Sequence, residues 1–247
     1  MSLLPWNAED LTFDEARFNG TVRLFPLPDL VMFPHVVQPL HIFEPRYRDL
    51  LNDALDGDGL IAMSILAPGW ERDYDGRPAL LPHVCVGKVV THMRLDDGRY
   101  NLMLLGMRRG RIVGERLATR SFREAEVVLM EDVYPDAGDA GRDDVQEKLA
   151  KAFHQALPLP QDTSTNEGPV QELLSSEVPL GVLTDLVSFA LPLKSALKRV
   201  LLGEVDVDRR ARLLLDAMGA PATAKAPASK PAILSARGPY PPKFSSN

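Results

Sequence analysis

The chain has 247 residues, of which 45% are hydrophobic and 25% are charged, which suits a globular protein with one large core or two modest ones. Its formal net charge is −6, and residues 221–247 carry four bases and no acid, so the rest of the chain is more acidic still. An acidic body disfavours a general nucleic-acid binder. The single cysteine, Cys85, excludes an internal disulfide, and no run approaches the roughly 18 apolar residues of a membrane span.

Residues 1–20 are expected to form an arm outside the main fold. Glu9 and Asp10 stand where a secretory signal peptide needs a basic start and an apolar run. Cys85 lies in an apolar alternation, which favours a small core residue over a reactive thiol. These features predict a cytoplasmic location without a membrane partner.

Residues 23–48 are rich in proline and in large apolar side chains. Proline fixes φ and removes a backbone donor, so this run is expected to form short extended pieces separated by turns. Glu44 and Pro45 then predict a helix start, with a short helix over 46–55.

The region that follows reads as β structure. The run 60–66 predicts a buried strand, and Pro68-Gly69 makes 67–82 a long loop. Asp96-Asp97-Gly98 predicts a hairpin turn, and Gly106 is expected to end its second strand. The predicted strands around and after that turn are 84–95, 99–105, 111–117 and 124–130.

From Asp144 onward the apolar spacing becomes helical. Helices are expected near 145–157, 183–191 and 193–202, and Asp206 can cap a last helix that ends at Gly219. Residues 220–247 offer no apolar face to bury, so we expect a disordered tail.

Two runs, LFPLPDLVMFP (24–34) and PLHIFEPRYRDLL (39–51), resemble the opening of the amino-terminal domain of Lon proteases and of bacterial-type stand-alone proteins that carry only that domain. The likeness continues through LDDGRYNLMLLGMRRGRI, GVLTDLVSFALPL and VDVDRRARLLLDAM, over roughly 22–218. It implies an α+β fold, with a PUA-like, mostly antiparallel β-barrel and one short helix over 21–135, then a helical bundle over 142–219. In Lon this domain engages substrate polypeptides. Gly110 departs from the larger side chain that the resemblance leads us to expect.

The catalytic parts of Lon, a GxxxxGK[ST] phosphate loop and a serine–lysine pair, have no counterpart in context here. Gly87-Lys88 is followed by two valines, and Lys194 and Ser195 are neighbours that do not face each other on a helix. His83, Cys85 and His92 are the least implausible metal cluster. His83 and Cys85 can share one face of a strand, but His92 falls on the opposite face, and no second close pair completes four ligands. We therefore expect a non-enzyme with no cofactor and no metal.

RNA binding is the first alternative function, since PUA domains proper often bind RNA. Its candidate residues are Arg108, Arg109 and Arg111, and further arginines follow up to Arg123. Glutamates are interleaved with them and stacking aromatics are few, so a solvated mixed-charge face is favoured over an RNA site.

Polypeptide binding is expected at the long loop, where Trp70, Arg72 and Tyr74 have the composition of a binding hot spot, with Phe33 on the same surface. The alternative is that these aromatics fold back over one end of the barrel. Methionines in the predicted strands, Met63, Met93, Met103 and Met107, could form an adaptable groove, although core filling is favoured.

The sequence thus predicts a non-catalytic protein that binds exposed apolar segments of other polypeptides, as an adaptor or a holding factor. Its expected partners are unfolded or extended polypeptides, within a protease or chaperone system, with nucleic acid less favoured. A peptidase is the second alternative, and the missing motifs argue against it.

Overall fold

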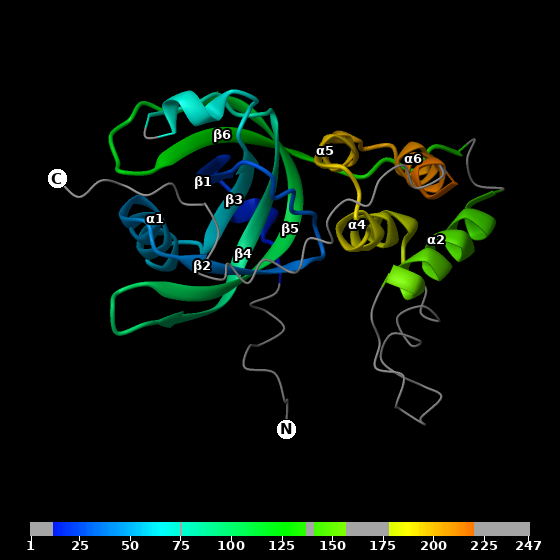
Figure 1. Ribbon diagram of the computed structural model, residues 1–247, viewed down its shortest axis with the longest axis horizontal. Coiled ribbons are helices and arrows are strands. Elements are labelled where there is room, and N and C mark those ends of the chain that lie inside the picture. Colours follow the sequence, from blue (N-terminus) through cyan, green and yellow to red (C-terminus); the bar gives the residue numbers. More distant parts are fainter. Residues whose placement is uncertain (1–11, 75, 137–140, 157–177, 220–247) are drawn as a thin grey trace, which may run out of the picture.

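The computed structural model describes residues 12–74, 76–136, 141–156 and 178–219, without the side chains of 153–156. A β-barrel carries a layer of helices on one side (Figure 1). The strands are β1 (Thr21–Leu27), β2 (Val37–Ile42), β3 (Leu60–Ile65), β4 (His83–Arg94), β5 (Tyr100–Glu115) and β6 (Arg123–Met130). The helices are α1 (Pro45–Leu55), α2 (Arg142–Ala156), α4 (Leu180–Ala190), α5 (Ser195–Gly203) and α6 (Val207–Gly219), with short 3-10 turns at Glu15–Arg17 and Trp70–Asp73.

The long strand β5 closes the barrel because its two halves pair with different neighbours. Along one edge it pairs first with β2 and then with β6, while β4 follows its other edge. The strand order is β2-β5-β4-β3-β1-β6, and the β5–β6 pairing completes the ring. Strands β1 and β3 pair in parallel, whereas the other pairs are antiparallel. The expected α+β fold, a PUA-like barrel followed by helices, is confirmed.

Helix α1 covers one end of the barrel (Figure 1). It begins at the expected proline and buries Leu50 and Leu51 completely. The Tyr47 ring lies 4.3 Å from that of Phe25 in β1. The Tyr47 hydroxyl donates to the Pro26 carbonyl at 3.3 Å, so the aromatic body is buried while its polar tip is satisfied.

Gly106 does not end a strand, contrary to the sequence expectation, because β5 continues through Gly110 to Glu115. Glycine is required here for close approach: a Cβ would overlap the carbonyl of Phe33. The Gly106 N–H donates to Val36 at 2.9 Å, and its carbonyl accepts from His35 at 2.8 Å. The strands expected at 99–105 and 111–117 are therefore one strand.

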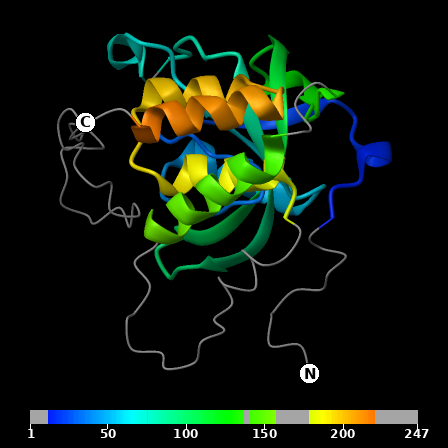
Figure 2. The same cartoon turned by 90° about the vertical axis from the view of Figure 1, so that its right-hand side faces the viewer.

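The remaining helices form a layer against the barrel wall (Figure 2). Their apolar faces meet in a cluster that continues into the barrel core, with fully buried members Leu149, Val187, Leu201 and Leu214. Asp206 caps α6 as predicted, since its side chain accepts from the Arg209 N–H at 2.9 Å. The expected tail over 220–247 and most of the expected arm lie outside the described residues.

A buried network of two arginines and two aspartates joins the helices to the barrel. Arg109 of β5 binds Asp185 of α4 through both terminal nitrogens, and one of these nitrogens also reaches Asp132 at 3.4 Å. Arg210 of α6 donates to both carboxylate oxygens of Asp132, at 2.9 and 2.7 Å. Arg210 and Asp185 are 0% exposed and Arg109 is 3% exposed.

Further hydrogen bonds hold this network in place. Arg210 donates to Thr184 Oγ1 at 2.7 Å and to the Glu204 carbonyl at 2.8 Å.

Burial raises the pKa of Asp185 against the opposing effect of the two guanidinium groups. At Asp132 burial acts in the same direction, but the hydrogen bonds from Arg210 prevail and lower its pKa. Removing one member would leave a partner charge buried and unpaired.

The close approach at Gly106 predicts a position-specific cost. Gly106→Ala should lower the free energy of unfolding by about 1–3 kcal/mol, because a backbone carbonyl must move to admit the methyl group. The matched control is Gly114→Ala in the same strand, where a Cβ meets no atom within 4 Å. Urea denaturation of both variants measures the difference, and equal stabilities would contradict the close-packing explanation.

The buried network predicts a larger cost. Asp185→Asn should lower the free energy of unfolding by about 3–5 kcal/mol in urea denaturation, because Arg109 loses the carboxylate that binds both of its terminal nitrogens and keeps only Asp132 at 3.4 Å. Lys148→Ala serves as the control and should cost roughly 0–1 kcal/mol, since its pair with Asp144 is exposed. The double variant Arg109→Met with Asp185→Leu should lose less than Asp185→Asn alone. A greater loss in the double variant would refute the view that unpaired charge sets the cost.

Candidate functional site

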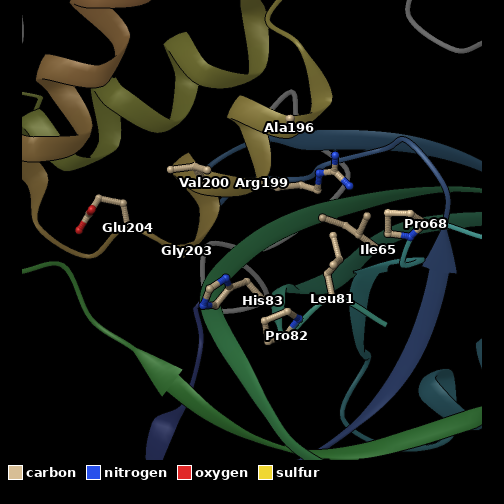
Figure 3. Close-up of a pocket in the computed structure, with 10 residues that line it drawn as sticks. All are labelled: Ile65, Pro68, Leu81, Pro82, His83, Ala196, Arg199, Val200, Gly203 and Glu204. Carbon is tan, nitrogen blue, oxygen red and sulfur yellow. The ribbon is translucent and has the colours of Figure 1, made fainter. Parts of the chain in front are cut away.

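A groove of about 550 Å³ separates the barrel from helix α5, and we refer to it as the interlobe groove (Figure 3). One wall comes from the end of β3 and the loop leading into β4, and the other comes from α5. The residues that line it are mostly apolar: Ile65, Pro68, Leu81, Pro82, His83, Ala196, Arg199, Val200, Gly203 and Glu204.

The loop wall is fixed by backbone hydrogen bonds at both of its ends. Ala67 donates to the Ala79 carbonyl at 2.8 Å, and Leu81 donates to the Ile65 carbonyl at 2.8 Å. The guanidinium of Arg123 binds the Pro78 carbonyl at 2.8 Å. These bonds hold Leu81 and Pro82 toward the groove, so its apolar surface is formed before any ligand binds.

The helix wall follows from helical spacing. Positions 196, 199, 200 and 203 of α5 lie on one face, since they are spaced by three and four residues. Leu201 and Leu202 point the other way and are buried, which anchors the helix. Val200 is 54% exposed, which leaves an aliphatic side chain open at the groove.

His83 lies where the two walls meet. A Cβ on Gly203 would overlap the imidazole ring, so the glycine lets α5 approach β4 closely. Burial lowers the pKa of His83, and Arg111 on the neighbouring strand lowers it further. The imidazole is therefore neutral at neutral pH. Glu204, the residue after Gly203, pairs with Arg209 at 3.1 Å.

The predicted loop aromatics pack against the protein. Trp70 and Tyr74 are half-buried and meet edge to face, with ring centroids 5.6 Å apart. The Tyr74 hydroxyl donates to Glu44 Oε1 at 2.7 Å, and the Arg46 guanidinium lies 4.9 Å from the centre of its ring. Arg72 is exposed. None of these side chains lines the interlobe groove, and their part in binding remains a prediction.

Two predicted site residues need correction. Phe33 is 0% exposed, because its loop crosses β5 at Gly106 and carries the ring into the core, so it cannot present a binding surface. Arg109 is buried with Asp185 and cannot reach an RNA phosphate. Of its two companions, Arg108 pairs with Glu15 at 3.0 Å and Arg111 is exposed.

One exposed surface was only the less favoured alternative in the sequence analysis. The preference for core filling fails for Met93 and Met103, which are 56% and 39% exposed, although it is correct for Met63 and Met107. For Met103 the sequence did contain a signal of exposure. Asn101 and Met103 alternate with leucines in β5, and this alternation turns the side chains of Asn101 and Met103 away from the core. They line a second cavity of about 570 Å³, across β2, β5 and β4.

The side chains considered for catalysis do not assemble into a site. Gly87 is packed against Leu104 inside β4, where Lys88 cannot form a phosphate loop. The Ser195 hydroxyl is buried and has no hydrogen-bond partner in the described part of the chain, so Lys194 does not activate it. In those same residues, no group of three or more His, Cys, Asp or Glu could hold a metal ion. No described helix is both long and apolar enough to cross a membrane.

Solved structures share this arrangement of barrel and helices. The N-terminal domain of Mycobacterium avium complex Lon protease is 19% identical and covers 79% of this chain and 96% of its own, with a TM-score of 0.61. A Lon N-terminal domain protein from Xanthomonas campestris is 22% identical, covering 79% of this chain and 97% of its own, with a TM-score of 0.56. At these identities the likeness establishes the fold.

Sequence comparison also finds Lon proteases. Lon protease 2 of Desulfotalea psychrophila is 30% identical over 197 residues, which are 78% of this chain and 24% of that protein. Lon protease of Cytophaga hutchinsonii is 26% identical over 161 residues, 62% of this chain and 19% of that protein. The chain thus spans about a quarter or less of the length of these relatives. Residues 21–219 match the family model of the ATP-dependent protease La (LON) substrate-binding domain, and the chain belongs to that family.

Proposed function

We propose that this protein binds exposed apolar segments of other polypeptides at the interlobe groove, without a covalent step, as an adaptor or a holding factor. The observation that carries the proposal is an apolar groove with a preformed loop wall and an exposed Val200, in a chain that matches a substrate-binding domain. Partners would be unfolded or extended polypeptides delivered to, or protected from, a protease or chaperone system.

The size and chemistry of the groove suit this role. Its volume of about 550 Å³ falls in the usual range for ligand sites and accommodates a few large side chains. Burying one Leu or Phe side chain contributes about 1.5–3 kcal/mol, so two or three such contacts give weak, reversible binding after the entropy cost. Arg199 and Glu204 supply one charge of each sign at the rim, which suits a polypeptide backbone and varied side chains.

A direct test is the substitution of Val200. Val200→Asp should weaken binding of a permanently unfolded reporter, reduced and carboxymethylated lactalbumin, at least tenfold, because apolar contact is lost and a carboxylate is desolvated. Fluorescence anisotropy with the full chain measures the affinity. Leu117→Asp is the control, since Leu117 is 88% exposed away from the groove and should leave binding unchanged. Equal binding by both variants would refute the groove as the site.

The neutral imidazole of His83 predicts a pH dependence of stability. Because burial lowers the pKa of His83, the unfolded chain takes up a proton near pH 6.5 while the folded chain resists it to lower pH. The free energy of unfolding should therefore fall between about pH 7.5 and about pH 5.5, and His83→Gln should make this fall smaller. Urea denaturation at both pH values measures it. An unchanged difference in the variant would exclude a contribution from His83.

A further inference from the structure

Strand β2 has an open edge. It pairs with β5 on one side, and no other strand of the described part of the chain pairs with its second side. Gly106 donates to the Val36 carbonyl, and hydrogen-bonded pairs alternate along an antiparallel ladder. Val37, Pro39 and His41 therefore turn their backbone groups away from β5. Pro39 fits this position because it has no N–H to give to the ladder.

Pro39 and His41 line the second cavity, and Val37 lies on the same face of β2 as these two residues. The strand register places Pro39 beside Met103, and Met103 beside Thr91 of β4. Val37 is 49% exposed, so together with Met93 and Met103 it forms an apolar sheet surface open to solvent. Unpaired backbone groups and exposed apolar side chains thus adjoin each other, which is the combination used when an extended peptide adds to a sheet.

We propose that an extended polypeptide segment adds as a short strand to the open edge of β2. It places alternate apolar side chains over the exposed surface formed by Val37, Met93 and Met103. The inference rests on the proposed function and names the mode of a second contact with the same class of partner. Unbranched methionines adapt to side chains of different shape, which suits varied sequences.

The charges around the cavity indicate which charge the added polypeptide segment should carry. Its described lining contains one full positive charge, Arg99, together with the imidazoles of His41 and His92, and no carboxylate. Asp97 binds Arg99 at 2.5 Å from outside the lining. An uncharged or acidic segment is therefore favoured over a basic one. Sedimentation analysis distinguishes this occupant from a second copy of the chain.

The edge is partly blocked, which limits the length of the added strand. The Gln38 side chain donates to the Pro39 carbonyl at 2.9 Å, so one of the two lone pairs of this acceptor is already used. Val37 and His41 remain as the two backbone donors, four positions apart. The pairing is thus about five residues long, which favours reversible capture and discourages extended aggregation along the edge.

Backbone methylation of a peptide tests this pairing. The probe is a fluorescent ten-residue peptide that alternates leucine with serine or glutamate, in two versions N-methylated either on the leucines or on the residues between them. An added strand turns only alternate N–H groups toward β2. We expect one version to bind the full chain at least tenfold more weakly and the other to bind within twofold of the parent. Equal effects would overturn strand addition. Replacing the glutamates by lysines should weaken binding, and stronger binding would refute the charge argument.

Chain variants locate the contact. Met103→Glu should weaken binding of the acidic peptide at least tenfold, whereas Val128→Glu, at a 52% exposed position of β6, should not. For mapping, Val37→Cys and Thr91→Cys are each mixed with a peptide that carries a cysteine activated as a mixed disulfide with thionitrobenzoate. The introduced thiolate attacks the peptide sulfur, forms a protein–peptide disulfide and releases thionitrobenzoate. Native Cys85 is 0% exposed and does not compete. Faster release from Val37→Cys supports the β2 edge, and faster release from Thr91→Cys overturns it.

The outcomes separate this inference from the proposed function. If Val200→Asp weakens reporter binding but the two methylated peptides behave alike, the proposed function stands and strand addition at β2 is wrong. If the chain binds neither the reporter nor the peptide, both fail. Dimerisation at micromolar concentration in sedimentation analysis, abolished by Met103→Glu, would show that the surface pairs with a second copy and would overturn the proposal.

Discussion

The buried network of Arg109, Asp132, Asp185 and Arg210 is the constraint on which the rest of the structure depends. Apolar contacts between the helices and the barrel are non-directional and tolerate small slides. Planar guanidinium groups bound to carboxylates do not, because a shifted arrangement leaves a charge buried without a partner. The network therefore sets how α4 and α6 sit on β5. Helix α5, which lies between them in sequence, makes its own contact with the barrel, where Gly203 packs against His83.

The interlobe groove is a consequence of that position. Its loop wall belongs to the barrel and its helix wall belongs to α5, so the distance between the walls depends on how α5 packs against β4. His83 and Gly203 set the closest point of approach, and Val200 remains open because α5 is held off the barrel beyond that point. A binding surface can thus be apolar and remain open, because the packing of α5 against β4 fixes how closely its two sides approach.

The length of β5 has a comparable effect on the sheet. Its first half carries Met103 beyond the barrel, its middle holds Gly106 under the Phe33 loop, and its second half brings Arg109 to the helices. The barrel closes only along the second half, where β6 pairs. The first half pairs with β2 instead, and among the described residues no strand pairs with the second edge of β2. The exposed methionine surface follows from the same strand that closes the barrel.

The sequence by itself determined most of the local structure and the fold family. Proline spacing, the Asp-Asp-Gly turn, the change to helical period after Asp144 and the Asp206 cap are local signals, because each acts within a few residues through φ restriction, turn geometry or a nearby N–H. Runs such as PLHIFEPRYRDLL indicated the family by their resemblance to the amino-terminal domain of Lon proteases. The resemblance implied a barrel followed by helices, and the local signals indicated strands first and helices after Asp144.

Only the tertiary structure decided which side chains remain on the surface. Gly106 reads as a strand end locally but serves a contact with a loop some 70 residues earlier in the chain. Arg109 reads as a solvated cation, yet Asp185 and Asp132, from two distant segments, make its burial possible. Trp70 and Tyr74 read as a hot spot, yet Glu44 and Arg46 hold Tyr74 down. Burial depends on partners that arrive from elsewhere in the chain, and no local pattern records where those partners will be.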